Sequence, residues 1–257
     1  MAMETAGTAH AVRTAAMLMA PGTWPGAVFV VGRRWSVAKA TWETTATFAD
    51  LRGYLGQPGC AICSCVGQSR RRFLEDLVYE NINDVGLRDR LRKGGGFCLR
   101  HVRALLDRKQ ALGTAILYGD LLRQRLRSFT ERGGPRALPL AQDCLLCQVE
   151  SESTRRATEV FAHALDAGRL QAEWEASEGF CWPHFITCRR LVRGQRAVLD
   201  RVEERCLADV ARDVEALIAS YDYTWTGTRS PEVAGAWRRV VAAVTGETDP
   251  AARDERT

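Results

Sequence analysis

The 257-residue sequence lacks several features that would place it in a familiar class. No run of about 18 apolar residues occurs, which excludes a conventional membrane-spanning helix. The first twenty residues lack a basic segment followed by an apolar one, so we expect no secretory signal and a cytoplasmic location with reduced thiols. No G-x-S-x-G, H-E-x-x-H or phosphate-binding loop occurs, so the sequence favours a non-enzymatic role.

The composition nevertheless predicts a folded protein. Apolar residues make up 46% and charged residues 26% of the chain, which provides enough apolar material for a core. The nine cysteines are an odd number, in a chain too long to need disulfide staples. The cysteines therefore need another explanation.

The cysteines fall into an internal repeat. A C-x2-C pair at Cys60–Cys63 recurs 84 positions later at Cys144–Cys147. A G-F-C-x2-H stretch at Gly96–His101 recurs 83 positions later at Gly179–His184. The two pairs have the same order and nearly the same spacing in both copies, so we interpret the sequence as a duplication of about 84 residues.

Apolar residues with a 3.6-residue period follow each motif, which predicts helices. We therefore expect an all-α fold of two homologous helical repeats, each with a Cys3His metal site, plus a C-terminal helix. The predicted domains are a poorly ordered or short-hairpin extension (1–47), a first repeat (48–139), a second repeat (140–223), and the C-terminal helix with its tail (224–257). The hairpin would use the apolar patch Val28–Val31. In the last helix we expect these residues to face inward: Trp237, Val240, Val241 and Val244.

Three thiolates and one imidazole per copy are a typical ligand set for a structural zinc ion. A cysteine and a histidine three residues apart share a face in the first turn of a helix, where the helix dipole favours a thiolate. The predicted metal ligands are Cys60, Cys63, Cys98, His101, Cys144, Cys147, Cys181 and His184. With all positions filled by protein, two such zinc sites would be closed and structural rather than catalytic.

Other readings of the eight residues remain open. They could bind an iron–sulfur cluster, form disulfides or simply pack in the core, although the spacing matches no common ferredoxin motif. The pairing is also open: each ion could join the two motifs of one copy, or motifs of different copies. Of the remaining cysteines, Cys65 and Cys188 are possible redox thiols, whereas Cys206 lies on an apolar helical face and is expected in the core.

The charge is uneven along the chain. Residues 60–143 carry 16 basic and 9 acidic side chains (net +7), and residues 144–223 carry 10 and 14 (net −4). A basic half can bind phosphate groups, but no recognition helix or aromatic platform accompanies the arginines. We therefore consider nucleic acid an unlikely partner, expect no membrane association, and leave an unknown protein partner possible.

The doubled motif resembles an uncharacterised bacterial family that carries a domain of unknown function. The stretch Leu77–Asp84 and the closing Tyr221–Tyr223 and Trp237 also carry the resemblance, which covers roughly residues 47–246. The resemblance implies a duplicated helical metal-binding protein and supplies no reaction. Three hypotheses result: a zinc-binding scaffold or regulatory protein, a redox-responsive or iron–sulfur protein, and a nucleic-acid-binding protein.

Overall fold

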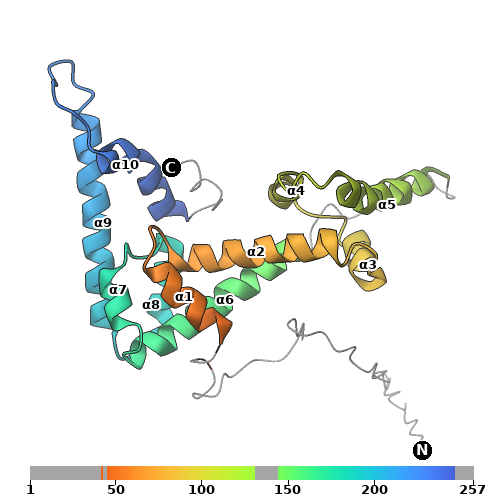
Figure 1. Ribbon diagram of the computed structural model, residues 1–257, viewed down its shortest axis with the longest axis horizontal. Coiled ribbons are helices and arrows are strands. Elements are labelled where there is room, and N and C mark those ends of the chain that lie inside the picture. Colours follow the sequence, from red (N-terminus) through yellow and green to blue (C-terminus); the bar gives the residue numbers. More distant parts are fainter. Residues whose placement is uncertain (1–41, 43–44, 131–143, 247–257) are drawn as a thin grey trace, which may run out of the picture. The chain divides into compact units, whose positions relative to one another are not determined.

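The computed structural model describes residues 42, 45–130 and 144–246, and these residues form ten helices with no β-strand among them (Figure 1). The expected all-α fold is therefore confirmed. The proposed hairpin at Val28–Val31 lies outside the described residues. The helices are α1 (Ala46–Leu55), α2 (Ala61–Tyr79), α3 (Val85–Lys93), α4 (Leu99–Leu106), α5 (Ala111–Thr130), α6 (Leu145–Asp166), α7 (Gln171–Ala176), α8 (Trp182–Leu191), α9 (Arg196–Ala219) and α10 (Pro231–Thr245).

Seven of the ten described helices begin in one of two ways. Three of them have ordinary N-caps: the side chains of Thr45, Asp84 and Ser230 accept backbone N–H bonds at the starts of α1, α3 and α10. In contrast, α2, α4, α6 and α8 each start directly after a cysteine whose side chain makes no capping bond. These four cysteines are therefore placed at helix N-termini, and their sulfur atoms take no part in capping the helices.

The centre of the fold is the pair α2 and α6, which run in opposite directions and pack side by side (Figure 1). Ser69 of α2 and Ser153 of α6 face each other, with their hydroxyl oxygens 2.9 Å apart. These two serines are 84 positions apart, the same offset as the C-x2-C motifs. The two helices thus meet at equivalent positions of the sequence repeat.

Two apolar clusters support this pair. One contains Leu74 and Leu77 of α2 together with Leu105, Leu117 and residues at the start of α6. The other stacks three aromatic rings of the second half, those of Phe161, Trp174 and Phe180, with centroids 4.6–5.3 Å apart. These clusters hold the segments before α4 and α8 in place, and those segments carry the G-F-C-x2-H motifs.

The expectation for the C-terminal helix needs a correction. In α10 the fully buried residue is Ala236, whereas Trp237, Val241 and Val244 are each more than half exposed. The helix packs on α9 and α8 instead, and Arg239 binds Asp213 of α9 at 2.5 Å. A small residue at the contact allows α10 to approach its neighbours closely, which leaves the larger side chains on the outer face.

In the described part of the chain, no helix is long and apolar enough to cross a membrane.

Candidate metal centres

The four helices that begin at cysteines bring their N-termini together in pairs. Cys60 and Cys63 of α2 meet Cys181 and His184 of α8, and we call this group the first site. The second site contains Cys98, His101, Cys144 and Cys147, from α4 and α6. The expectation that each copy closes its own site is therefore wrong. Each site takes its C-x2-C pair from one copy and its C-x2-H pair from the other, which is the exchanged alternative left open by the sequence.

The four ligand atoms of each site lie within 4.8 Å of one another. In the first site, Cys63 Sγ and Cys181 Sγ are 3.7 Å apart, and His184 Nδ1 is 3.1–3.5 Å from the three sulfurs. In the second site, Cys98 Sγ and Cys147 Sγ are 3.8 Å apart, and His101 Nδ1 is 3.3–3.4 Å from the sulfurs.

These distances suit one tetrahedral ion per site. A tetrahedron with metal–sulfur bonds of about 2.3 Å has sulfur–sulfur edges of about 3.8 Å. In an iron–sulfur cluster the cysteines bind different iron atoms and would be spread further apart. Each group can therefore hold a single metal ion with four protein ligands, which leaves no open position for a substrate.

The surroundings favour a cation at each site. Two helix N-termini point at each group of ligands, and their partial positive charge stabilises thiolates. Burial opposes ionisation of Cys144, yet hydrogen bonds from His101 and from backbone groups lower its pKa to about 6. In the first site, hydrogen bonds from Cys181 and Cys60 hold the pKa of Cys63 well below its usual range. A buried thiolate among further thiols needs a compensating positive charge, which a metal ion supplies.

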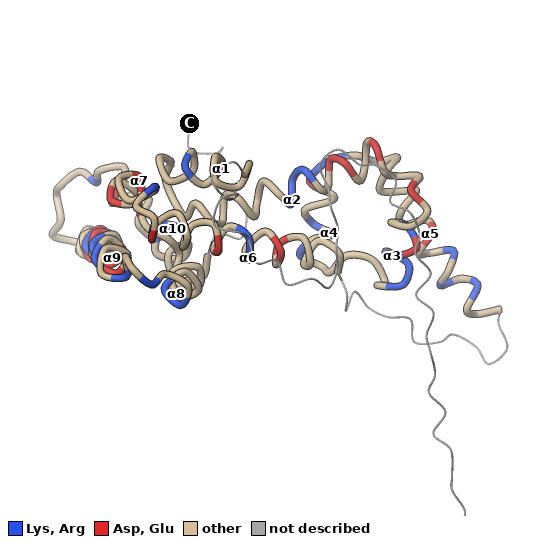
Figure 2. Tube along the Cα trace, turned by 90° about the horizontal axis from the view of Figure 1, so that it is seen from below, with Lys and Arg blue, Asp and Glu red and all other residues tan. Residues whose placement is uncertain are grey.

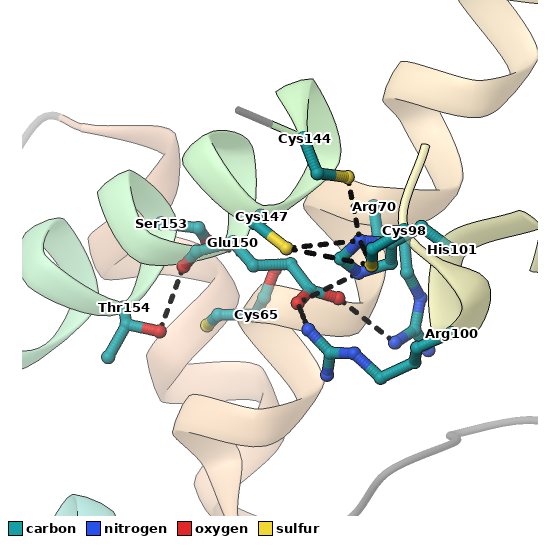
Figure 3. A network of polar contacts seen from close by, with 10 residues as sticks. All are labelled: Cys65, Arg70, Cys98, Arg100, His101, Cys144, Cys147, Glu150, Ser153 and Thr154. Carbon is teal, nitrogen blue, oxygen red and sulfur yellow. Dashed lines mark hydrogen bonds and ion pairs between the residues drawn. The ribbon is translucent and has the colours of Figure 1, made fainter. Parts of the chain in front are cut away.

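A carboxylate orients the histidine of the second site (Figure 3). Glu150 is buried, and its Oε2 atom lies 3.1 Å from His101 Nε2, on the side of the ring opposite the sulfurs. Arg70 donates to the other oxygen at 3.1 Å, and Arg100 also donates to this carboxylate. Such a carboxylate fixes the ring orientation and tautomer of a metal-binding histidine and makes it a better ligand.

Sequence reasoning missed Glu150, although a signal was present. Glu150 is three residues after Cys147, so it lies one turn further along the same face of α6. The equivalent residue in the first copy, 84 positions earlier, is Val66, which cannot bind a histidine. The two sites are therefore chemically unequal, although their ligand sets are the same.

The two sites share a cavity of about 350 Å³. Its wall includes ligands of both sites, such as Cys63, Cys147 and His184, together with Arg70 and Glu150. At its edge the end of α10 covers the first site: a Cβ atom on Gly246 would lie 3.5 Å from Cys181 Sγ. All three cysteines of the first site are buried, whereas Cys147 of the second site is exposed.

The loops before α4 and α8 are held in the same way. The N–H of Phe97 donates to the hydroxyl of Tyr118 at 3.4 Å, and the N–H of Phe180 donates to the carboxylate of Glu203 at 2.9 Å. Tyr118 and Glu203 occupy corresponding places on α5 and α9, 85 positions apart. The Gly before each Phe has positive φ, and at Gly179 a Cβ atom would meet Glu203 at 2.9 Å. Glycine in this motif therefore allows both the turn and the close approach.

The remaining cysteines are buried in the core. Burial raises the pKa of Cys65 to about 12 and raises that of Cys188 well above its usual range. Both therefore favour the neutral thiol, which is a poor nucleophile. Cys206 is also buried and lies beside Gly179. None of the three belongs to either group of ligands.

Comparison with known proteins gives a relative without an assigned role. The chain is 36% identical over 97 residues to an uncharacterised 23.9 kDa protein in the xynA 3′ region of Caldicellulosiruptor sp. (strain Rt8B.4). The match covers 35% of this chain and 45% of that relative, so the chain spans less than half of the relative's length. No family model and no solved structure matches the chain. These findings agree with the resemblance to an uncharacterised family.

Proposed function

We propose that the protein binds two zinc ions in closed structural sites and acts as a helical scaffold or regulatory protein. The observation that carries the proposal is the exchanged convergence of the eight ligands at four helix N-termini. Zinc suits this donor set and tetrahedral spacing, and it has no redox chemistry of its own. In this role each ion connects the two copies and keeps the α2–α6 pair in one register.

The domain boundaries at residues 47, 139 and 223 and the cytoplasmic location are part of the same proposal. A duplicated ancestor accounts for the equal positions of Ser69 and Ser153 and for the paired roles of Tyr118 and Glu203. Thiolate ligands need a reducing compartment to remain available for metal.

Elemental analysis of purified protein tests the metal. We expect two zinc ions per chain and no visible absorption. Cys98→Ser and Cys181→Ser should each lose one ion while keeping the other, because they belong to different sites. Cys206→Ser, at a buried cysteine outside both sites, is the matched control and should keep both ions. Fewer than two ions in the native protein, or retention of both in the two ligand variants, contradicts the proposal.

A redox-responsive site is the alternative proposal, and the exposure of Cys147 supports it. In that case peroxide would oxidise the second site before the first, two thiolates would form a disulfide, and the zinc ion bound there would be released. Release of one ion per chain by peroxide, reversed by a thiol reductant, would favour this alternative over a purely structural role.

Nucleic-acid binding through the basic half has less support. Many of its basic side chains bind acidic groups within the chain: Arg70 binds Glu150, Arg88 and Arg123 bind Asp120, and Lys93 binds Asp89. Acidic positions (red) also lie among the basic ones (blue) in the region of α2 to α5, the helices of the basic half (Figure 2). Binding to an oligonucleotide that weakens steeply with salt would revive this alternative.

A further inference from the structure

Helix α5 is apolar on two opposite faces, but neighbouring helices cover only one of them. On the covered face Leu117 and Leu121 are buried, and Gly113 contacts Val78 of α2. On the opposite face, Leu112, Leu122, Leu126 and Phe129 have exposed fractions of 76%, 58%, 57% and 67%. A helix that is apolar on both faces is normally buried on both.

The repeat itself provides a comparison for this face. Helix α9 is the counterpart of α5, as the equivalent roles of Tyr118 and Glu203 indicate. Where α5 has Ala115 and Gly119, α9 has Asp200 and Glu204 at the same 85-residue offset. The fold therefore tolerates charge on this face, and the apolar face of α5 needs another explanation.

The spacing on the exposed face is that of a coiled-coil seam. Intervals of three and four residues alternate along it, as at the a and d positions of a heptad repeat. We define the α5 seam as Leu112, Ala115, Gly119, Leu122, Leu126 and Phe129.

We propose that the α5 seam binds the α5 seam of a second copy of this chain, with the two helices antiparallel. The seam is complementary to itself in this orientation. A twofold axis between positions 120 and 121 sets Leu112 opposite Phe129, Ala115 opposite Leu126, and Gly119 opposite Leu122 of the second copy. Each small residue then meets a large one. A parallel pair would instead set Gly119 against Gly119 and leave a void.

The charges beside the seam agree with this pairing. Arg123 and Arg125 are the basic residues that flank it. In the antiparallel arrangement Arg123 lies beside Ile116 and Arg125 beside Tyr118 of the second copy, so no two arginines meet. Gly119 also allows the helices to approach closely, because a Cβ atom there would meet only the flexible side chain of Arg123.

The area available indicates a weak dimer. The exposed apolar side chains of two copies would together bury roughly 1,000 Å², which is below the usual range for stable specific interfaces and within that of weak, transient ones. We therefore expect dissociation in the micromolar range, roughly 1–100 µM.

Sedimentation equilibrium of the metal-loaded full-length protein tests the proposal. The native protein should change from monomer to dimer between roughly 1 and 200 µM. Leu122→Glu and Gly119→Lys should each remain monomeric over this range, with unchanged helix content and metal content. Arg127→Ala, an exposed position off the seam that changes the charge by the same amount as Leu122→Glu, should dimerise like the native protein.

Mixing variants tests the orientation. In the antiparallel pair, Lys at position 119 of one chain meets Glu at position 122 of the other, and the second such layer remains native. A mixture of Gly119→Lys and Leu122→Glu should therefore form heterodimers, whereas a mixture of Leu122→Glu and Leu126→Glu should not.

A native protein that stays monomeric, or a dimer that persists in both single variants, overturns the proposal. Loss of the dimer without rescue in the first mixture overturns the antiparallel pairing. A monomer whose α5 seam is protected from hydrogen exchange would mean that the chain covers the seam itself, which also overturns the proposal.

Discussion

At the scale of single residues, Glu150 is the clearest difference between the two candidate metal sites. It contacts the histidine of the second site, while Val66 takes its place in the first copy. Burial opposes ionisation of Glu150, but His101, and to a smaller extent Arg100 and Arg70, lower its pKa below the usual value. The carboxylate is therefore charged at neutral pH and can accept a hydrogen bond from the N–H at His101 Nε2.

Glu150→Gln should weaken metal binding at the second site alone. We expect a loss of roughly 10- to 100-fold in affinity, as is typical when the carboxylate partner of a ligating histidine is removed. Competition with a chromophoric chelator would then resolve one weakened and one native site per chain. Glu152→Gln, on the exposed side of α6, changes the charge equally and should leave both sites native. Equal weakening of both sites would show that Glu150 acts on general stability instead.

At the scale of helices, α9 positions the start of α8 through Glu203. This carboxylate is 1% exposed, and its Oε1 atom has no hydrogen-bond partner among the described residues. Burial raises its pKa from 4.5 to about 7, against the opposing hydrogen bond from Phe180. The folded state therefore holds a proton at Glu203 more tightly than the unfolded state does.

The pH dependence of stability follows from this difference. The contribution of Glu203 is fully present below about pH 4.5 and is lost as the pH rises through about 7. Glu203→Gln keeps an oxygen for the Phe180 N–H and does not titrate. The variant should be more stable than the native protein at pH 8, by about 3 kcal/mol, with a smaller difference of about 2 kcal/mol at pH 6.

Urea unfolding of the metal-loaded proteins at a series of pH values measures this difference. Because both proteins contain the same metal ligands, the pH dependence of metal binding cancels between them. Glu204→Gln, the exposed neighbour on α9, is the charge-matched control and should follow the native protein. A constant difference between Glu203→Gln and the native protein from pH 6 to 8 would show that the buried carboxylate is not protonated.

The helices could be predicted because their signals are local. The 3.6-residue period, the caps at Asp84 and Ser230, and the glycines before α4 and α8 each depend on a few neighbouring residues. The outward face of α10 could not be predicted, because Trp237 and Val241 look like core residues in a periodic pattern. Which face is covered depends on where α8 and α9 lie, and that information is not local.

At the scale of the whole molecule, the same limit applies to the metal sites. The motif spacing predicted which residues group as C-x2-C and C-x2-H pairs, and the structure brings these pairs together in fours. It did not predict which pairs meet. Cys63 is separated from Cys98 by 34 residues but lies next to Cys181. The opposite directions of α2 and α6 bring the start of α2 to α8 and the start of α6 to α4. The number of residues between the C-x2-C and C-x2-H pairs of one copy is the same whether each metal site forms within a copy or between copies, so this spacing cannot distinguish the two arrangements.

The exchanged pairing makes a prediction about how the two halves separate. With a protease site inserted between residues 131 and 143, cleavage would leave two fragments joined by the α2–α6 contact and by both metal ions. We expect the fragments to stay together through size-exclusion chromatography with metal bound and to separate after chelation, in mild urea if necessary. If each metal ion were bound within one copy, no metal ion would connect the two fragments, and chelation would not be what separates them.

The same cleaved chain carrying Cys98→Ser and Cys181→Ser should separate without a chelator, because each substitution removes one ligand from one of the two metal sites that connect the fragments. A cleaved double variant that stays together as firmly as the cleaved native chain would show that helix packing alone holds the halves and that the exchanged sites contribute nothing to their association.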